Sequence, residues 1–532
     1  MSIKQQVKKM VVLSLLVGTM FAIFAPLTAL AQESERQLPY DSHGGIIFHA
    51  WNMRFDLIEE LLPEIAASGF NTIQTSPIGN SIFQFPNRSY VGTWWMLYQP
   101  IKFEIGNMLG TEAEFRSLTA AANEMGLRVI VDAIPNHTTS WWNEIDDSLR
   151  RPELFHSVPG DGTFWDRSIT QFDMRNDSRR SRLLGLVDFY TGNPEFQALY
   201  MDFLSHIIEA GASGFRYDAM VHIELPYPYD SENIASDFWP RIQAHVDEQV
   251  LATGRTPFQY GEILGRWHAD YLRALPGMLV TADRYGYHVR DSIIRDQTLG
   301  RWDHQMFMAA GYENTTAERF VLWVESHDTY GNAGISRDIT DEQMRVGWAF
   351  ITVRQGTTPL FLVRPGDGFV NNGQMFYRRE DGSYGNNWGH RDFFQDETIV
   401  AINWFANYFI NQPERISDYD RQIALIERGP EGATTGIVII NIGDENRPVN
   451  FPVQMVDDEY ECHVTGATFT VSNGYITGPD IAGVSVLVIY NPGAIIDIEL
   501  PMLFIVTTSI AAVLIIGGYV WTVKKRNKPE VA

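Results

Sequence analysis

The segment Gly214–Glu224, which reads GFRYDAMVHIE, carries an arginine, an aspartate and a histidine around a short apolar run. Alternate side chains share one face of a β-strand, so Arg216 and Asp218 would point the same way at a strand's C-terminal end. A cation beside a carboxylate favours the ionised form of the acid, which suits a nucleophile. The same two residues could instead form a buried ion pair that only holds the strand end. This segment alone leaves both interpretations open.

Acids and histidines also follow three other predicted strands. In a parallel barrel the C-terminal ends of the strands open at one mouth, so residues from different strands converge there. Any single one of them could be a strand cap or an ion-pair residue, but their joint placement favours a common site. The residues are Asp132, Asn136, His137, Arg216, Asp218, His222, Glu262, His327 and Asp328.

The elements that would position these residues alternate between strands and amphipathic helices. Gly45–Ala50 (GIIFHA) predicts a strand, and apolar residues three and four apart over Phe55–Ala67 predict the helix that follows it. About eight such units predict an α/β fold, a (β/α)₈ TIM barrel over residues 42–412. The alternative is a doubly wound open sheet, which would usually show a Gly-rich phosphate turn after its first strand. GIIFHAW has no such turn.

Two further domains are predicted from breaks in this alternation. After the third strand, residues 138–189 show no sustained period, and long insertions of this kind are usually functional or form a subdomain. We therefore expect an insertion domain that protrudes from the barrel. Residues 413–491 change to short β-rich runs between Gly, Asn and Asp turns, which predicts a C-terminal antiparallel β-sandwich domain.

Both ends of the chain have features of targeting segments. Residues 1–31 combine early lysines, an apolar stretch and a small-x-small cleavage site, which predicts a signal peptide. Residues 500–523 contain no charged residue and precede a basic cluster, which predicts a transmembrane helix with residues 524–532 as a cytoplasmic tail. A buried core helix is the alternative for 500–523. A signal peptide together with a transmembrane helix predicts an exported protein anchored on the outer face of the cytoplasmic membrane.

Composition restricts the partners. The formal net charge of −24 argues against a nucleic-acid partner, because phosphates would be repelled. Aromatic residues make up 13% of the chain, which suits a sugar-binding cleft, although large cores use aromatic residues too. Cys462 is the single cysteine, so no intramolecular disulfide can form. No obligate protein partner is evident from the sequence.

Four segments resemble, in order, the four sequence regions of the α-amylase family of retaining glycoside hydrolases. They are VDAIPNH (131–137), GFRYDAMVH (214–222), YGEI (260–263) and VESHD (324–328). The likeness extends to WWMLYQP (94–100), IGNMLGTEAEF (105–115) and TPLFLVRP (358–365). The chain is similar to secreted bacterial α-amylases over nearly all of Gly44–Tyr490.

The resemblance implies roles for the acids. Asp218 would be the nucleophile, Glu262 the general acid/base and Asp328 the third carboxylate, which binds sugar hydroxyls. Retaining hydrolysis requires an ionised and a protonated carboxyl group ~5–5.5 Å apart. His137 and His327 would donate to hydroxyls of the sugar at the cleavage point. The substrate-binding set implied is Trp94, Trp95, Tyr98, His137, Arg216 and His327, with core packing as the alternative for the two tryptophans.

The resemblance also implies a structural Ca²⁺ where the insertion domain meets the barrel. The matching ligands are the side chains of Asn136 and Asp188 and the main-chain carbonyls of Arg179 and His222. Oxygen donors from distant segments suit a hard cation. A helix cap is the alternative role for Asp188.

The chain departs from the family pattern at two positions. Val221 replaces a lysine that touches sugar on the leaving-group side in many α-amylases, and Ser326 replaces an asparagine of chloride-activated members. The resemblance implies endo-acting hydrolysis of α-1,4-glucosidic bonds in starch and malto-oligosaccharides. A glucan transglycosylase would use the same residues, and a non-catalytic membrane-anchored ectodomain is the alternative from another class.

Overall fold

A computed structural model describes residues 45–82, 92–299, 315–365, 375–379, 384–386 and 392–491. The predicted signal peptide, transmembrane helix and cytoplasmic tail lie outside these residues. Within the described ranges, no helix combines the length and the apolar character that a membrane span requires.

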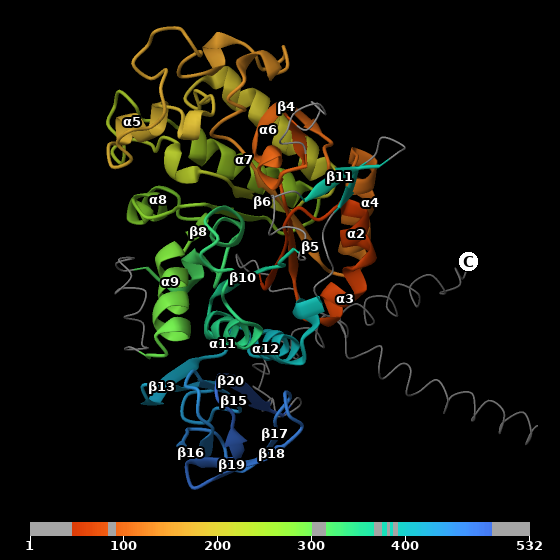
Figure 1. Ribbon diagram of the computed structural model, residues 1–532, viewed down its shortest axis with the longest axis vertical. Coiled ribbons are helices and arrows are strands. Elements are labelled where there is room, and N and C mark those ends of the chain that lie inside the picture. Colours follow the sequence, from red (N-terminus) through yellow and green to blue (C-terminus); the bar gives the residue numbers. More distant parts are fainter. Residues whose placement is uncertain are drawn as a thin grey trace, which may run out of the picture.

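Eight parallel strands close into a barrel in the order β1-β10-β9-β8-β7-β6-β5-β2, which confirms the predicted fold class (Figure 1). The strands are β1 (Ile47–Ala50), β2 (Thr72–Thr75), β5 (Arg128–Ala133), β6 (Gly214–Tyr217), β7 (Phe258–Gly261), β8 (Leu279–Thr281), β9 (Phe320–Leu322) and β10 (Thr358–Leu362). Each strand is buried along its whole length. Burial on both faces explains why strands such as β1 (IFHA) and β10 (TPLFL) do not alternate strictly between apolar and polar residues.

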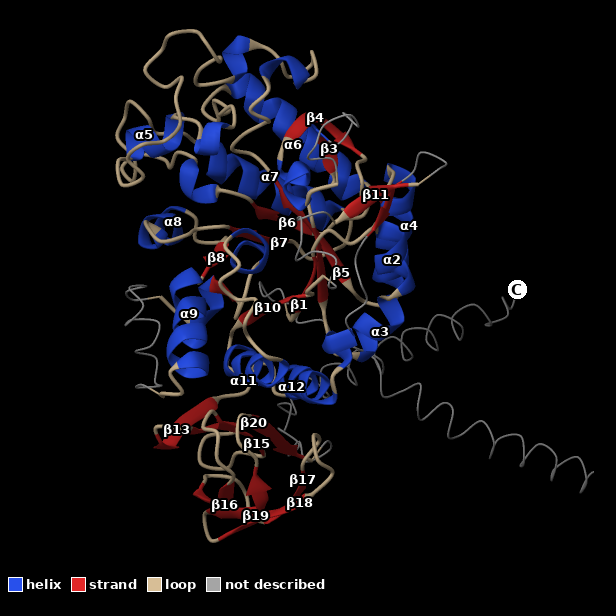
Figure 2. Cartoon of the chain, in the orientation of Figure 1, coloured by secondary structure: helices blue, strands red, loops and turns tan. Residues whose placement is uncertain are grey.

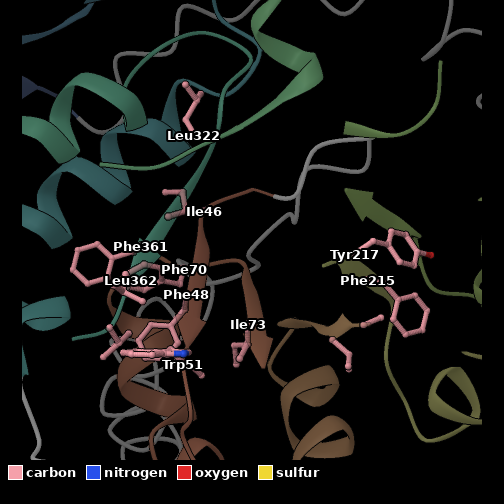
Figure 3. Close-up of a cluster of buried hydrophobic side chains, with 14 of the residues drawn as sticks. Ile46, Phe48, Trp51, Phe70, Ile73, Phe215, Tyr217, Leu322, Phe361 and Leu362 are labelled. Carbon is pink, nitrogen blue, oxygen red and sulfur yellow. The ribbon is translucent and has the colours of Figure 1, made fainter. Parts of the chain in front are cut away.

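Helices pack around the outside of the barrel. They include α2 (Phe55–Glu60), α3 (Leu62–Ala67), α4 (Glu112–Glu124), α6 (Pro194–Glu209), α7 (Phe238–Ala252), α8 (His268–Ala274), α9 (Asp283–His288), α11 (Asp341–Thr352) and α12 (Glu397–Tyr408). Figure 3 shows Phe48, Phe70 and Phe361 meeting in the layer between strands and helices, with the Phe48 and Phe70 ring centroids 5.3 Å apart. A second cluster, which includes Ile47, Ile130 and Leu360, fills the barrel interior.

The single helix predicted over Phe55–Ala67 is wrong in one respect, because the structure divides it at Leu61 into α2 and α3. Pro63 occupies the first turn of α3, where its missing N–H costs nothing. In an unbroken helix the same proline would remove a hydrogen bond and clash with the preceding turn. The proline therefore sets the break.

The insertion leaves the barrel after β5 and returns before α6. It consists of loops, short 3₁₀ turns and one short helix, α5 (Arg175–Arg180). Backbone bridges Phe155–Phe189 and His137–Asp188 fasten its two ends beside the barrel. Figure 1 shows this region at the opposite end of the molecule from the C-terminal strands.

The C-terminal strands form two four-stranded antiparallel sheets, ordered β13-β14-β15-β20 and β16-β19-β18-β17. α11 and α12 lie between the first sheet and the barrel (Figure 2). β15 is buried on both faces: Val438 and Ile440 join the barrel core, while Ile437 and Ile439 face the second sheet. The strands are β13 (Glu414–Asp420), β14 (Ile423–Arg428), β15 (Gly436–Asn441), β16 (Arg447–Pro452), β17 (Asp458–Glu461), β18 (Thr468–Ser472), β19 (Tyr475–Ile481) and β20 (Ser485–Tyr490).

Candidate active site

A cleft of about 640 Å³ opens at the C-terminal ends of the barrel strands. Residues from the strand ends form its floor, and the insertion domain forms one wall. All three predicted catalytic acids and five of the six predicted substrate-binding residues line it. Those residues are Asp218, Glu262, Asp328, Trp94, Trp95, Tyr98, His137 and His327.

Arg216, the sixth, lies beneath the cleft and joins three carboxylates. Its Nη1 lies 2.7 Å from Asp132 Oδ1 and 2.6 Å from Asp218 Oδ1. Its Nη2 lies 2.5 Å from Glu262 Oε1. Burial alone would lower the pKa of Arg216, but the surrounding carboxylates outweigh burial and raise it well above its usual range. Arg216 is therefore a permanent cation at the centre of the acid cluster.

Glu262 is held as a buried acid. Burial raises the pKa of Glu262 to about 8; Arg216 opposes this shift, and the charges of Asp218 and Asp328 add to it. Its Oε2 accepts a hydrogen bond from the backbone N–H of Ala219, at 3.0 Å. A carboxyl group in this environment keeps its proton at neutral pH, as a proton donor must.

The turn after β6 has a strained backbone. Ala219, directly after Asp218, has a φ of 51° in the left-handed region, which non-glycine residues rarely adopt. Such strain persists where surrounding contacts fix the conformation, and it clusters at functional sites. Here the turn brings the N–H of Ala219 to Glu262 and directs Asp218 into the cleft.

Asp132 has a part in the site that was not assigned to it from the sequence. Its Oδ2 accepts a hydrogen bond from the Tyr98 hydroxyl at 3.0 Å, and its Oδ1 contacts Arg216. Burial raises the pKa of Asp132 to about 7, with Arg216 acting in the opposite direction. Asp132 thus links Tyr98, on the cleft floor, to Arg216 in the acid cluster. Its place at the end of β5 was the only signal for this in the sequence.

Aromatic rings form the floor beside the acids. The Tyr98 and His327 rings stack with centroids 5.3 Å apart and an interplanar angle of 14°. Trp94 contacts both rings and packs on buried Trp51, which no sequence motif singles out. Burial lowers the pKa of His137 and of His327, so both imidazoles are neutral at neutral pH.

Asp328 and His327 are carried by a loop that a buried ion pair anchors. Arg364 binds Glu325 with two parallel contacts, Nε to Oε1 at 2.6 Å and Nη2 to Oε2 at 3.0 Å. Arg364 also donates to the carbonyls of Ser336 and Ile339 further along the loop. A bidentate pair of this kind fixes orientation as well as distance. Nothing in the sequence pairs these two residues, because they follow different strands.

Comparison with known proteins shows which family the chain is similar to. The profile of the family described as "Alpha amylase, catalytic domain" matches residues 58–273. An α-amylase of Clostridium acetobutylicum is 29% identical over 505 residues, which cover 92% of this chain and 60% of that protein. An α-amylase of Butyrivibrio fibrisolvens is 30% identical over 483 residues, covering 84% and 47%. The chain is therefore similar to the α-amylase family over most of its length.

The solved structure of α-amylase I from Eisenia fetida shares the fold of this chain. Its TM-score is 0.64 at 18% identity, and the match covers 84% of this chain and 97% of that one. The two bacterial relatives are longer proteins, since the chain spans 60% and 47% of their lengths.

Metals are common in the α-amylase family, and the structure brings the four predicted calcium ligands together in two pairs. The Asn136 carbonyl accepts from the Phe189 N–H at 2.9 Å, next to Asp188. His222 Nδ1 lies 3.1 Å from the Ser178 carbonyl, next to Arg179. Among the described residues, no group of three or more His, Cys, Asp or Glu side chains is arranged to hold a metal. The predicted set relies instead on one carboxylate, one amide and two carbonyls.

A buried imidazole links these two halves. His156 Nδ1 lies 2.7 Å from Asp188 Oδ2, and its Nε2 lies 3.0 Å from Glu224 Oε1. Burial would lower the pKa of His156, but the two carboxylates raise it to about 9. Burial raises the pKa of Asp188 to about 7 despite this partner. One imidazolium faces two carboxylates, so the cluster has an excess negative charge when both acids are ionised, and it fits a cation.

Proposed function

We propose that the protein hydrolyses internal α-1,4-glucosidic bonds of starch and malto-oligosaccharides with retention of configuration. The observation that carries this proposal is the guanidinium of Arg216, which contacts Asp218 at 2.6 Å and Glu262 at 2.5 Å. One cation thereby holds a potential nucleophile and a protonated acid on adjacent strand ends. A retaining glycosidase needs this pair of carboxyl groups close together.

In the first step, Asp218 attacks the anomeric carbon and forms a covalent glycosyl ester. Glu262 gives its proton to the glycosidic oxygen, and the chain on the leaving side departs as an alcohol. In the second step, the ionised Glu262 takes a proton from water, whose oxygen displaces Asp218 from the same carbon. Asp328 and the neutral imidazoles of His137 and His327 bind hydroxyls of the reacting sugar.

Product analysis on soluble starch tests this function. We expect an early mixture of short and medium oligosaccharides in the α-anomeric form. Chromatography over time measures the product lengths, and NMR identifies the anomer. Release of a single small sugar from chain ends would refute endo-cleavage, and β-anomeric products would refute retention.

Transglycosylation is a second candidate, because the wall on the insertion-domain side of the cleft is mostly apolar. Leu183, Leu184 and Leu186 line it together with Val221 and Leu264. Such a wall can hold a second sugar and exclude water from the covalent intermediate. Products longer than the starting oligosaccharide would support this activity. The non-catalytic alternative is disfavoured, since all three acids line the cleft.

We also propose that Asn136, Asp188 and the carbonyls of Arg179 and His222 hold Ca²⁺ as a structural clip. Chelation should then lower the melting temperature. A ligand that binds only the folded state adds about 2.7 kcal/mol when its concentration is 100 times Kd. Calorimetry with and without EDTA measures this shift.

The matched variants are Asp188→Ala and Asp480→Ala, the second on an exposed position of β19. Asp188→Ala should melt lower in calcium and lose its response to EDTA, whereas Asp480→Ala should respond like the wild type. Unfolding of the wild type that is indifferent to EDTA would contradict the metal site.

We further propose that residues 500–523 anchor the exported enzyme on the outer face of the cytoplasmic membrane. The uncharged run and the basic residues after it support this. A chain that ends at Glu499 should be recovered as active enzyme in the medium, while the longer chain should sediment with membranes. Equal release of both forms would exclude the anchor.

A further inference from the structure

Arg266 lines the cleft beyond the proposed acid Glu262, in the connection between β7 and α8. Two aromatic rings pack against its guanidinium, with the centroid of Phe172 at 5.7 Å and that of Trp267 at 5.8 Å. Phe172 comes from the insertion domain, so the arginine spans the junction between that domain and the barrel. Stacking of this kind holds the planar group in one orientation.

The described residues use little of the hydrogen-bonding capacity of this guanidinium. Its Nη1 donates to Asp173 Oδ1 at 2.6 Å. Among the described residues, this is the one hydrogen bond that the Arg266 side chain makes. The Asp173 side chain is 95% exposed, so this pair is weak. A guanidinium has five N–H donors. Arg266 therefore combines a fixed plane with donors that remain available to a ligand.

The chemistry of the proposed reaction defines which sugar lies beside Arg266. Asp218 bonds to the sugar that stays, whereas Glu262 protonates the oxygen of the chain that leaves. The wall that continues past Glu262 therefore borders the leaving chain. Phe172 contacts His222 as well as Arg266, because its ring also packs on the His222 ring with centroids 5.9 Å apart.

Leu184, from the insertion domain, supplies an apolar surface to the same cleft. The residue is 81% exposed, and its φ of 53° places its backbone in the left-handed region. An exposed leucine in a strained backbone suits a binding surface better than a packing role. Sugar rings present C–H faces and hydroxyl edges, so they need an apolar surface and hydrogen-bond donors side by side.

Arg266 is the single lysine or arginine among the described residues that line the cleft. Val221, on the same wall, is buried and apolar and offers no side-chain donor. Among the described lining residues, Arg266 is therefore the lysine or arginine that can donate to the leaving chain. Asp173 and Phe172 hold it in place from the insertion domain.

We propose that Arg266 and Leu184 form a subsite for a glucose unit of the leaving chain, in which the guanidinium donates to sugar hydroxyls and the leucine supports the apolar face. Phe172 and Asp173 position the guanidinium. This inference rests on the proposed hydrolytic function, and it assigns the specificity for the leaving group to the junction between the two domains.

Two substrates test the subsite. Maltoheptaose places glucose units on the leaving side, whereas nitrophenyl α-maltotrioside, cleaved at its aryl bond, places none there. We expect Arg266→Met to lower kcat/KM for maltoheptaose about tenfold, mainly through KM, because a charge-assisted hydrogen bond is lost. Release of nitrophenol should change by less than about twofold. Leu184→Ala should show the same selectivity with a smaller loss.

Arg116→Met is the matched control, because Arg116 pairs with exposed Glu112 on α4, away from the cleft. It should leave both substrates unaffected. Equal losses on both substrates, or none on either, for Arg266→Met and Leu184→Ala would overturn the subsite. Absence of wild-type turnover on both substrates would instead refute the hydrolytic function.

Discussion

Asp218→Asn is expected to lower kcat for malto-oligosaccharides on the order of 10⁴–10⁶-fold while the fold stays intact. The amide keeps the size of the carboxylate, but it cannot form the glycosyl ester. It also keeps an oxygen that can accept the hydrogen bond from Arg216 Nη1, which lies 2.6 Å from the carboxylate in the wild type. The loss should therefore come from chemistry rather than from collapse of the acid cluster.

Steady-state kinetics on maltoheptaose, together with thermal unfolding, measure this effect. Asp480→Asn, on an exposed position of β19, controls for the amide substitution itself. It should leave both kcat and Tm unchanged. Near-normal turnover by a folded Asp218→Asn enzyme would show that another residue is the nucleophile.

The barrel strands could be predicted because they are short segments, buried on both faces, that alternate with amphipathic helices. The predicted strand Gly45–Ala50 contains β1, Ile47–Ala50. The two ends of a helix are harder to predict. The split at Leu61 depends on a proline whose effect differs between a helix interior and a first turn.

The acids and histidines selected for the active site share one property, which is that each stands at or shortly after the end of a predicted strand. The contacts between residues far apart in the chain could not be predicted in this way. Arg364 and Glu325 are 39 positions apart, His156 and Asp188 are 32 apart, and Arg216 and Asp132 are 84 apart. These pairs depend on neighbouring strands and on the folded path of the insertion, which periodicity does not encode. Arg266 was missed for the same reason, because its partner Phe172 belongs to the insertion domain.

The acid cluster explains how one acid remains protonated. Three buried carboxyl groups, of Asp132, Asp218 and Glu262, surround the single cation of Arg216. One positive charge cannot neutralise three buried negative charges, so protons must remain on part of the cluster. Burial raises the pKa of Asp132 to about 7 and that of Glu262 to about 8. A protonated Glu262 is therefore a property of the cluster.

The kcat/KM of the wild type should accordingly fall at alkaline pH. Glu262 acts in its protonated form, and its folded-state pKa is raised to about 8. Activity should hold below this pH and decrease about tenfold per unit above it, as the proton is lost. The pH profile of kcat/KM on maltoheptaose measures this limb.

Glu262→Gln should lower kcat for maltoheptaose by about 10³-fold or more, because glutamine cannot donate the proton that the leaving alcohol needs. The alkaline limb should disappear with it. An aryl glycoside with a dinitrophenol leaving group needs no such proton, so formation of its glycosyl ester by Asp218 should continue and give a burst of dinitrophenol. If the variant lost the burst while folded, Glu262 would act on more than the leaving group. If the alkaline limb remained, it would belong to another acid, with Asp132 the first to test, since its pKa is also raised by burial.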